Sequence, residues 1–115
     1  MSEEERNKFG ILIANQYGVQ EKLGQSQSHK LDLIKQMNHI VPALMAMEHG
    51  IKGHVGMTTM ASAGGAIAIG EAYRLVKHGY CDRIIAGGLD LNVTPLCHGG
   101  MDSFGALTRS FNENP

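Results

Sequence analysis

The hydrophobic residues of this chain fall into short segments that glycine and polar residues separate. Phe9 to Ala14 is apolar through Ile11-Leu12-Ile13 and is ended by polar residues, which predicts a buried strand. His54 to Met60 predicts a second strand. Arg83 to Ala86, closed by Gly87-Gly88, predicts a third strand, also buried.

Other segments have apolar residues at helical spacing. This spacing begins at Leu31, but Pro42 would remove a backbone hydrogen bond from a continuous helix. We therefore expect a boundary near Asn38 and a second helix that runs through His49 and ends at Gly50.

The clearest helix is predicted over Gly64 to His78, which has basic residues in its last turn and Gly79 just beyond. Tyr17 to Lys30 is polar and predicts an external loop. Gly99-Gly100 followed by Met101 to Leu107 predicts a loop that enters a short helix. Strands and helices thus alternate, which indicates a single α/β domain over residues 1–115.

Charge and cysteine content narrow the possible partners. Ten basic and eleven acidic side chains leave a net charge of −1, so neither nucleic acid nor an anionic membrane is indicated. Cys81 and Cys97 have no metal-ligand spacing, and no apolar run is long enough to span a membrane. Met1 to Asn7 is acidic and lacks a targeting pattern. We expect no metal and no cofactor.

The segment most suited to chemistry runs from Met57 to Gly70, where a strand passes through small residues into a helix. This turn places Ser62 at the helix N-terminus, where backbone amides can stabilise a thiolate or an oxyanion. A structural interpretation is also open, because serine is a preferred N-cap and small residues allow close packing.

The same segment resembles a known family. Ala61 to Arg74 is similar to the run Ala-Cys-Ala-Thr-Gly-Ala-His-Ala-Ile-Gly-Asp-Ala-Phe-Arg of β-ketoacyl-acyl-carrier-protein synthases, and Ser62 falls on the nucleophilic cysteine of that run. The similarity continues on both sides, at Gly50-Ile51-Lys52-Gly53, His78-Gly79, Ala86-Gly87-Gly88, Thr94-Pro95-Leu96, Ala106-Leu107-Thr108 and Phe111-Asn112-Glu113-Asn114-Pro115.

The resemblance implies part of a thiolase-like fold, the incomplete first half of a condensing enzyme, with a mixed sheet and packed helices. It also implies a catalytic cysteine assisted by two histidines and a lysine from a second half that these residues do not include. None of the six histidines falls on a catalytic position, and His98 and Cys97 are expected in a loop. Cys81 is expected just before a strand.

A serine nucleophile needs an adjacent base, and none can be assigned to Ser62. Family positions have also changed at Met60, Gly64, Ile67 and Met101. We therefore predict a non-catalytic protein that serves as a structural or interaction subunit of a larger assembly. The alternative is a 3-oxoacyl-acyl-carrier-protein synthase of fatty-acid biosynthesis, represented by a fragment.

The interaction hypothesis requires a partner, because part of a fold leaves apolar surface uncovered. We expect a second copy or another protein, with acyl carrier protein as a further candidate. The predicted contact surface lies around Cys81 to Gly88 and Met101 to Leu107. The family resemblance suggests a mitochondrial location, with the cytoplasm as the alternative.

Overall fold

The structure is a computed structural model that describes residues 1–16, 34, 37–90, 93–108 and 110. Its elements alternate between helix and strand, which confirms the predicted α/β class. In chain order they are α1 (Glu3–Asn7), β1 (Phe9–Ala14), α3 (Ile40–His49), β2 (Val55–Thr58), the short 3-10 helix η1 (Ala61–Ala63), α4 (Gly64–Lys77), β3 (Arg83–Gly88) and α5 (Pro95–Ser103).

The sheet has β1 in its centre, with the strand order β2-β1-β3. Both pairings are parallel, and Ala14 of β1 lies opposite Thr58 on one side and Gly88 on the other. A mixed sheet was expected, but the described strands are all parallel because a helix lies between each pair of consecutive strands. Their carboxyl ends therefore meet at one edge of the sheet.

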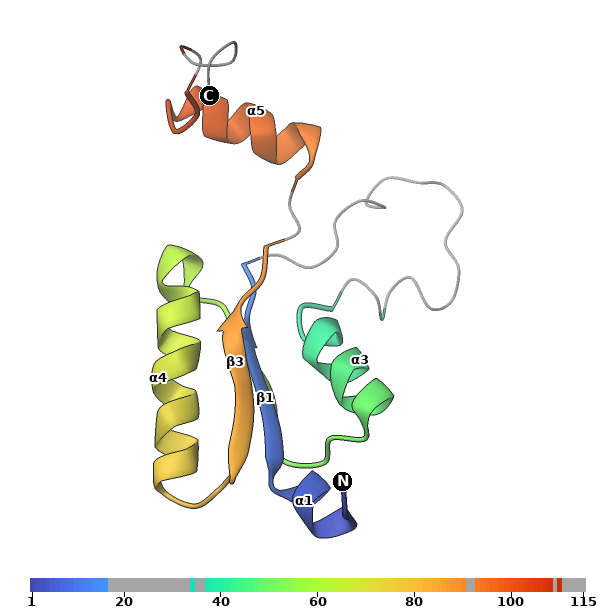
Figure 1. The fold of residues 1–115 in the computed structure, drawn as a ribbon. Coiled ribbons are helices and arrows are strands. Elements are labelled where there is room, and N and C mark those ends of the chain that lie inside the picture. The colour runs from blue at the N-terminus through green and yellow to red at the C-terminus, as the bar shows by residue number, and fades with distance from the viewer. Residues whose placement is uncertain (17–33, 35–36, 91–92, 109, 111–115) are drawn as a thin grey trace.

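Helices cover the two faces of the central strand (Figure 1). Ile11 and Ile13 belong to a buried cluster with Ala46 of α3. Leu12 and Ala14 belong to a second cluster that includes Ala68 and Ala72 of α4. Alternate side chains of β1 thus point to opposite helices, which explains why the strand is continuously apolar in sequence.

Small residues bring α4 close to the sheet. A Cβ at Gly64 would stand 2.9 Å from the Cβ of Ala14, and a Cβ at Gly88 would stand 3.4 Å from the Cα of Gly65. The prediction that Gly87-Gly88 closes the third strand is wrong, because β3 continues through both glycines. The lack of a side chain at Gly88 admits the helix without ending the strand.

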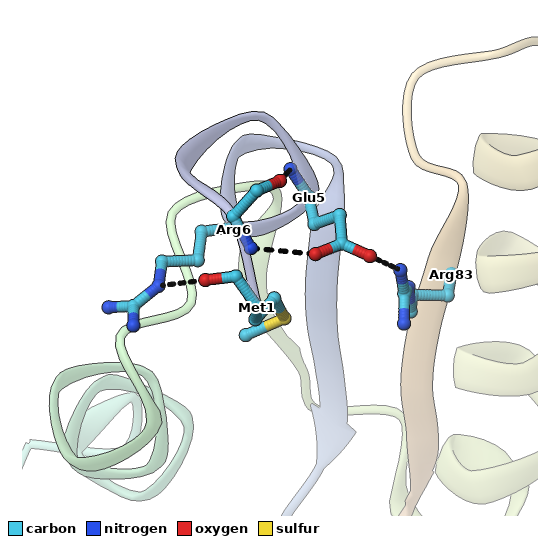
Figure 2. A network of polar contacts seen from close by, with 5 residues as sticks. Met1, Glu5, Arg6 and Arg83 are labelled. Atoms are coloured by element: carbon cyan, nitrogen blue, oxygen red, sulfur yellow. Dashed lines mark hydrogen bonds and ion pairs between the residues drawn. The ribbon is translucent and has the colours of Figure 1, made fainter.

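Helix α1 ties the N-terminus to the start of β3 (Figure 2). Ser2 and Glu5 form a capping box, in which the Ser2 backbone N–H donates to Glu5 Oε2 at 2.6 Å. Arg83 Nη2 donates to the other carboxylate oxygen, Oε1, at 3.2 Å. The bond from the Ser2 backbone and the nearby Arg83 guanidinium hold the pKa of Glu5 below its ordinary value. Arg6 Nε donates to the Met1 carbonyl at 3.3 Å.

The helix predicted through His49 is confirmed as α3. Pro42 lies in its first turn, where the missing amide costs no helical hydrogen bond, and Gly50 follows with a left-handed φ of 62°. The loop predicted over Tyr17 to Lys30, and most of the segment from Leu31 to Asn38, lie outside the described residues. Strand β2 is shorter than predicted, and α4 matches its predicted range with His78 as the C-cap.

The short helix predicted over Met101 to Leu107 is wrongly placed. Helix α5 begins at Pro95 and contains Gly99 and Gly100, which were assigned to a loop. The Thr94 hydroxyl accepts a hydrogen bond from the Cys97 backbone N–H at 3.2 Å, and proline favours the first helical position. The Thr-Pro pair was therefore the start signal, and Cys97 and His98 lie in a helix.

Candidate functional site

The predicted site forms where β2 leads into α4, near the carboxyl edge of the sheet. Ser62 is the middle residue of η1 and is exposed to solvent. Asn15 follows β1 at the same edge, and its backbone N–H donates to the Thr58 carbonyl at 3.1 Å. Ligands of parallel α/β sheets bind outside this edge, so Ser62 lies in a suitable region.

The turn that presents Ser62 is sharp. Ala61 has a φ of 45°, and among the described residues it is the one non-glycine residue with a positive φ. Such a conformation costs an alanine about 1–2 kcal/mol relative to the right-handed region. The backbone N–H of Ala63 donates to the Met60 carbonyl at 3.1 Å, and that of Gly64 donates to the Ala61 carbonyl. The chain thus reverses sharply around the Ser62 side chain.

The structural interpretation of this turn had two parts, an N-cap role for Ser62 and close packing by the small residues around it. The N-cap of α4 is Ala63, and no side chain caps this helix, so Ser62 does not serve as its cap. The close packing expected of the glycines is present at Gly64 and Gly65. The turn also engages the amides of Ala63 and Gly64, which leaves fewer donors at the helix N-terminus for an oxyanion.

No base is paired with Ser62 in the part of the chain that the structure describes, where its hydroxyl has no hydrogen-bond partner. His54 and His78 line a pocket along the C-terminal half of α4 instead. His78 lies sixteen residues beyond Ser62, which is roughly 24 Å along a helix. An isolated serine hydroxyl is a weak nucleophile at neutral pH.

Both cysteines lie away from the elbow, which is the turn at Ala61–Ala63 that presents Ser62. Cys81 is 1% exposed, and its sulfur lies 3.1 Å from the position that a Cβ at Gly10 would take. The Cys81 side chain therefore fills the core and offers no contact itself, and the contact surface around Cys81 to Gly88 stays a prediction. Cys97 belongs to α5 and is partly buried.

Asn15 is a feature that the sequence interpretation missed. It is 6% exposed, and its Oδ1 atom has no hydrogen-bond partner among the described residues. A buried amide oxygen normally accepts from a protein group or an ordered water. The signal in the sequence was the amide directly after the apolar run of β1, at the edge where ligands bind.

Metal ligands and membrane-spanning helices both bear on the kind of site. Within residues 1–16, 34, 37–90, 93–108 and 110, no three histidine, cysteine or acidic side chains are grouped to hold a metal ion. In the same residues, no helix has both the length and the hydrophobicity needed to cross a bilayer.

Comparison with known proteins places the chain in a family. The model of the N-terminal domain of β-ketoacyl synthases matches residues 2–115. The 3-oxoacyl-[acyl-carrier-protein] synthase 2 of Synechocystis is 34% identical over 89% of this chain and 27% of its own length. A Schizosaccharomyces pombe protein provisionally named a mitochondrial 3-oxoacyl-[acyl-carrier-protein] synthase is 32% identical over 88% of this chain and 24% of its own length.

A third relative is more distant but covers more of the chain. The mitochondrial 3-oxoacyl-[acyl-carrier-protein] synthase of Arabidopsis thaliana is 26% identical over 98% of this chain and 27% of its own length. The chain thus spans about a quarter of the length of these relatives. The parallel sheet with helices on both faces agrees with part of a thiolase-like fold. The chain therefore belongs to the β-ketoacyl synthase family, through its match to the model of that family's N-terminal domain.

Proposed function

We propose that this chain is a non-catalytic β-ketoacyl synthase-like domain that serves as a structural or interaction subunit of a larger assembly. One observation carries the proposal. Ser62 is exposed in the turn between β2 and α4, and no base is paired with it in the described residues. The resemblance of Ala61 to Arg74 to the family motif implies that Ser62 takes the place of the nucleophilic cysteine.

A cysteine thiol and a serine hydroxyl differ in how readily they act as nucleophiles at neutral pH. A thiol beside a helix N-terminus ionises readily, and the thiolate attacks an acyl group without further help. A serine hydroxyl keeps its proton at neutral pH unless a base removes it. The helix N-terminus beside Ser62 supplies partial positive charge but accepts no proton. The turn therefore presents Ser62 to solvent, but its hydroxyl is not activated as a nucleophile.

An exposed apolar stripe on α4 supports the interaction role. Ala66, Ile69, Tyr73 and Val76 recur at helical spacing and are all exposed, although α4 already packs its small residues on the sheet. The side chains of Ile69 and Tyr73 are 58% and 63% exposed. Exposed apolar surface of this kind marks a contact site, and we propose that a second copy or another protein covers it.

The alternative is that the chain is part of an active 3-oxoacyl-acyl-carrier-protein synthase, in which the remaining groups come from elsewhere. The retained elbow and the names of the relatives favour this candidate. It would make acyl carrier protein a partner, since the relatives are named for synthesis on that carrier. It requires that Ser62 receive a base from residues outside those described.

We also propose a mitochondrial location. The proposal rests on two relatives that are named as mitochondrial proteins, from Schizosaccharomyces pombe and Arabidopsis thaliana. Imaging of a C-terminally tagged natural gene product tests it. Co-localisation with a mitochondrial marker is expected, and a diffuse cytoplasmic signal would support the alternative location.

A condensation assay tests the non-catalytic function. The purified natural gene product is incubated with acyl and malonyl carrier protein, and 3-oxoacyl product is measured beside the Synechocystis relative as a positive control. We expect no product above the rate without protein. Product formation that disappears in Ser62→Ala would refute the proposal and favour the synthase alternative.

A further inference from the structure

A pocket of about 200 Å³ lies along the C-terminal half of α4, separate from the Ser62 elbow. Its lining residues are His54, Glu71, Arg74, Leu75, His78 and Tyr80. Arg74 is twelve residues beyond Ser62, which is roughly 18 Å along a helix. The pocket thus lies in a different region of the molecule from Ser62, the residue considered for acyl transfer.

The helix supplies most of one wall. Glu71, Arg74 and His78 are spaced at i, i+3 and i+7, so their side chains share one side of α4. This side differs from the apolar stripe that contains Tyr73. Lys77 lies on that other side, where its ammonium group is 5.6 Å from the centre of the Tyr73 ring.

The end of α4 fixes the position of Tyr80. Gly79 has a left-handed φ of 76°, and its backbone N–H donates to the Val76 carbonyl at 3.0 Å. The Tyr80 N–H donates to the Leu75 carbonyl at 2.9 Å, which completes a Schellman motif. The motif holds Tyr80 beside Leu75. It also occupies helix-end carbonyls that would otherwise repel an anion.

The opposite wall comes from His54, directly before β2. Its carbonyl accepts a hydrogen bond from the Ile11 N–H at 2.7 Å, which anchors the backbone to β1. Its Nε2 atom lies 2.8 Å from the position of a Cβ at Gly56, so the imidazole occupies space that only a glycine leaves free. The His54 ring therefore lies against Gly56 of β2, while the residue remains exposed to solvent.

The pocket has more hydrogen-bond donors than acceptors. Arg74, the two histidines and the Tyr80 phenol offer N–H or O–H groups, whereas Glu71 is the single carboxylate in the lining. Within the described residues, neither Arg74 nor Glu71 is engaged in an ion pair. The Arg74 guanidinium is thus available to a ligand.

We propose that this pocket binds the phosphate group of a small phosphate monoester. A guanidinium fork pairs well with phosphate oxygens, and donors on separate elements suit a tetrahedral group better than a planar carboxylate. The volume of about 200 Å³ exceeds the roughly 30 Å³ of one water molecule in the liquid, so it admits the phosphate and part of the esterified group.

To test this proposal, the natural gene product is titrated with inorganic phosphate at constant ionic strength, and the heat of binding is measured by isothermal titration calorimetry. Arg74→Gln is expected to weaken binding roughly tenfold, because a hydrogen bond to a charged group is lost. Glu71→Gln is expected to tighten binding, because the repelling carboxylate is removed. Lys77→Gln is the matched control, since it removes the same charge from the same helix outside the pocket.

The three variants have side chains exposed to solvent, so each substitution leaves the core unchanged. Equal weakening in Arg74→Gln and Lys77→Gln would overturn the proposal, because binding would then follow net charge alone. An absence of phosphate binding by the unsubstituted protein, or equally strong binding of acetate, would also overturn it.

Discussion

Replacement of Ala61 by glycine should stabilise the protein, because this residue holds the strained turn before Ser62. Its φ of 45° lies in the left-handed region, which costs an alanine about 1–2 kcal/mol. Glycine removes that cost but adds about 0.5–1 kcal/mol of backbone entropy to the unfolded chain. The Ala61 side chain is exposed, so little packing is lost. The net expectation for Ala61→Gly is a gain of about 0.5–1 kcal/mol.

Ala63→Gly is the matched control for this prediction. Ala63 is exposed in the same turn, but its φ of −82° and ψ of −9° are right-handed. The entropy of the unfolded chain should cost this variant at most about 0.5–1 kcal/mol, because Ala63 is also the N-cap of α4, where glycine is preferred to alanine. The entropy term is common to both variants, so a gain in Ala61→Gly that Ala63→Gly does not show reports the strain at Ala61. Urea unfolding measures both free energies, and equal destabilisation of the two variants would show that Ala61 is not held in a left-handed conformation.

Three further predictions concern the site, the N-terminal helix and the contact surface predicted around Cys81 to Gly88 and Met101 to Leu107. Ser62→Cys should gain slow modification by iodoacetamide, measured by intact mass, but should not gain condensation activity. Measurable 3-oxoacyl product would show that the two histidines and the lysine were wrongly expected to come from a second half. Glu5→Gln should lower the free energy of unfolding at pH values above the ordinary glutamate pKa. This loss relative to the unsubstituted protein should vanish as pH falls through the lowered pKa of Glu5, because the unfolded state takes up the proton at a higher pH than the folded state. Glu4→Gln, at an exposed residue of the same helix, is the matched control in pH-dependent unfolding. Aspartate at Ile85 or Leu107 should weaken assembly or folding, and a folded monomer unaffected by either change in sedimentation would count against an interaction subunit.

Much of the fold follows from local patterns in the sequence. Strand β1 is predicted with its observed bounds because its apolar run is buried by helices on both faces. Helix α4 is predicted because its last turn and Gly79 carry clear stop signals. The end of β3 is missed because a pair of glycines is typical of a turn, whereas here Gly88 serves the close approach of Gly65. That approach depends on a tertiary contact, which local spacing does not contain.

The candidate site is predicted only in part. The elbow follows from the small residues around Ser62, but the left-handed backbone of Ala61 does not, since alanine rarely adopts it. The start of α5 is missed because the pair Gly99-Gly100 is typical of a loop, whereas the Thr94 hydroxyl caps a helix that includes both glycines. The sequence shows an amide directly after the apolar run of β1, but it does not show that folding buries the Asn15 amide oxygen.

Acyl transfer to Ser62 is the measurement that tests the central claim most directly. The natural gene product is incubated with acyl carrier protein that bears a labelled acyl chain, and the protein is then examined by intact mass and peptide mapping. A non-catalytic domain predicts an unchanged mass, with the Ser62 peptide unmodified, while the Synechocystis relative becomes acylated under the same conditions. An acyl group on Ser62 would contradict the account, because it would show that the serine hydroxyl is activated at the elbow.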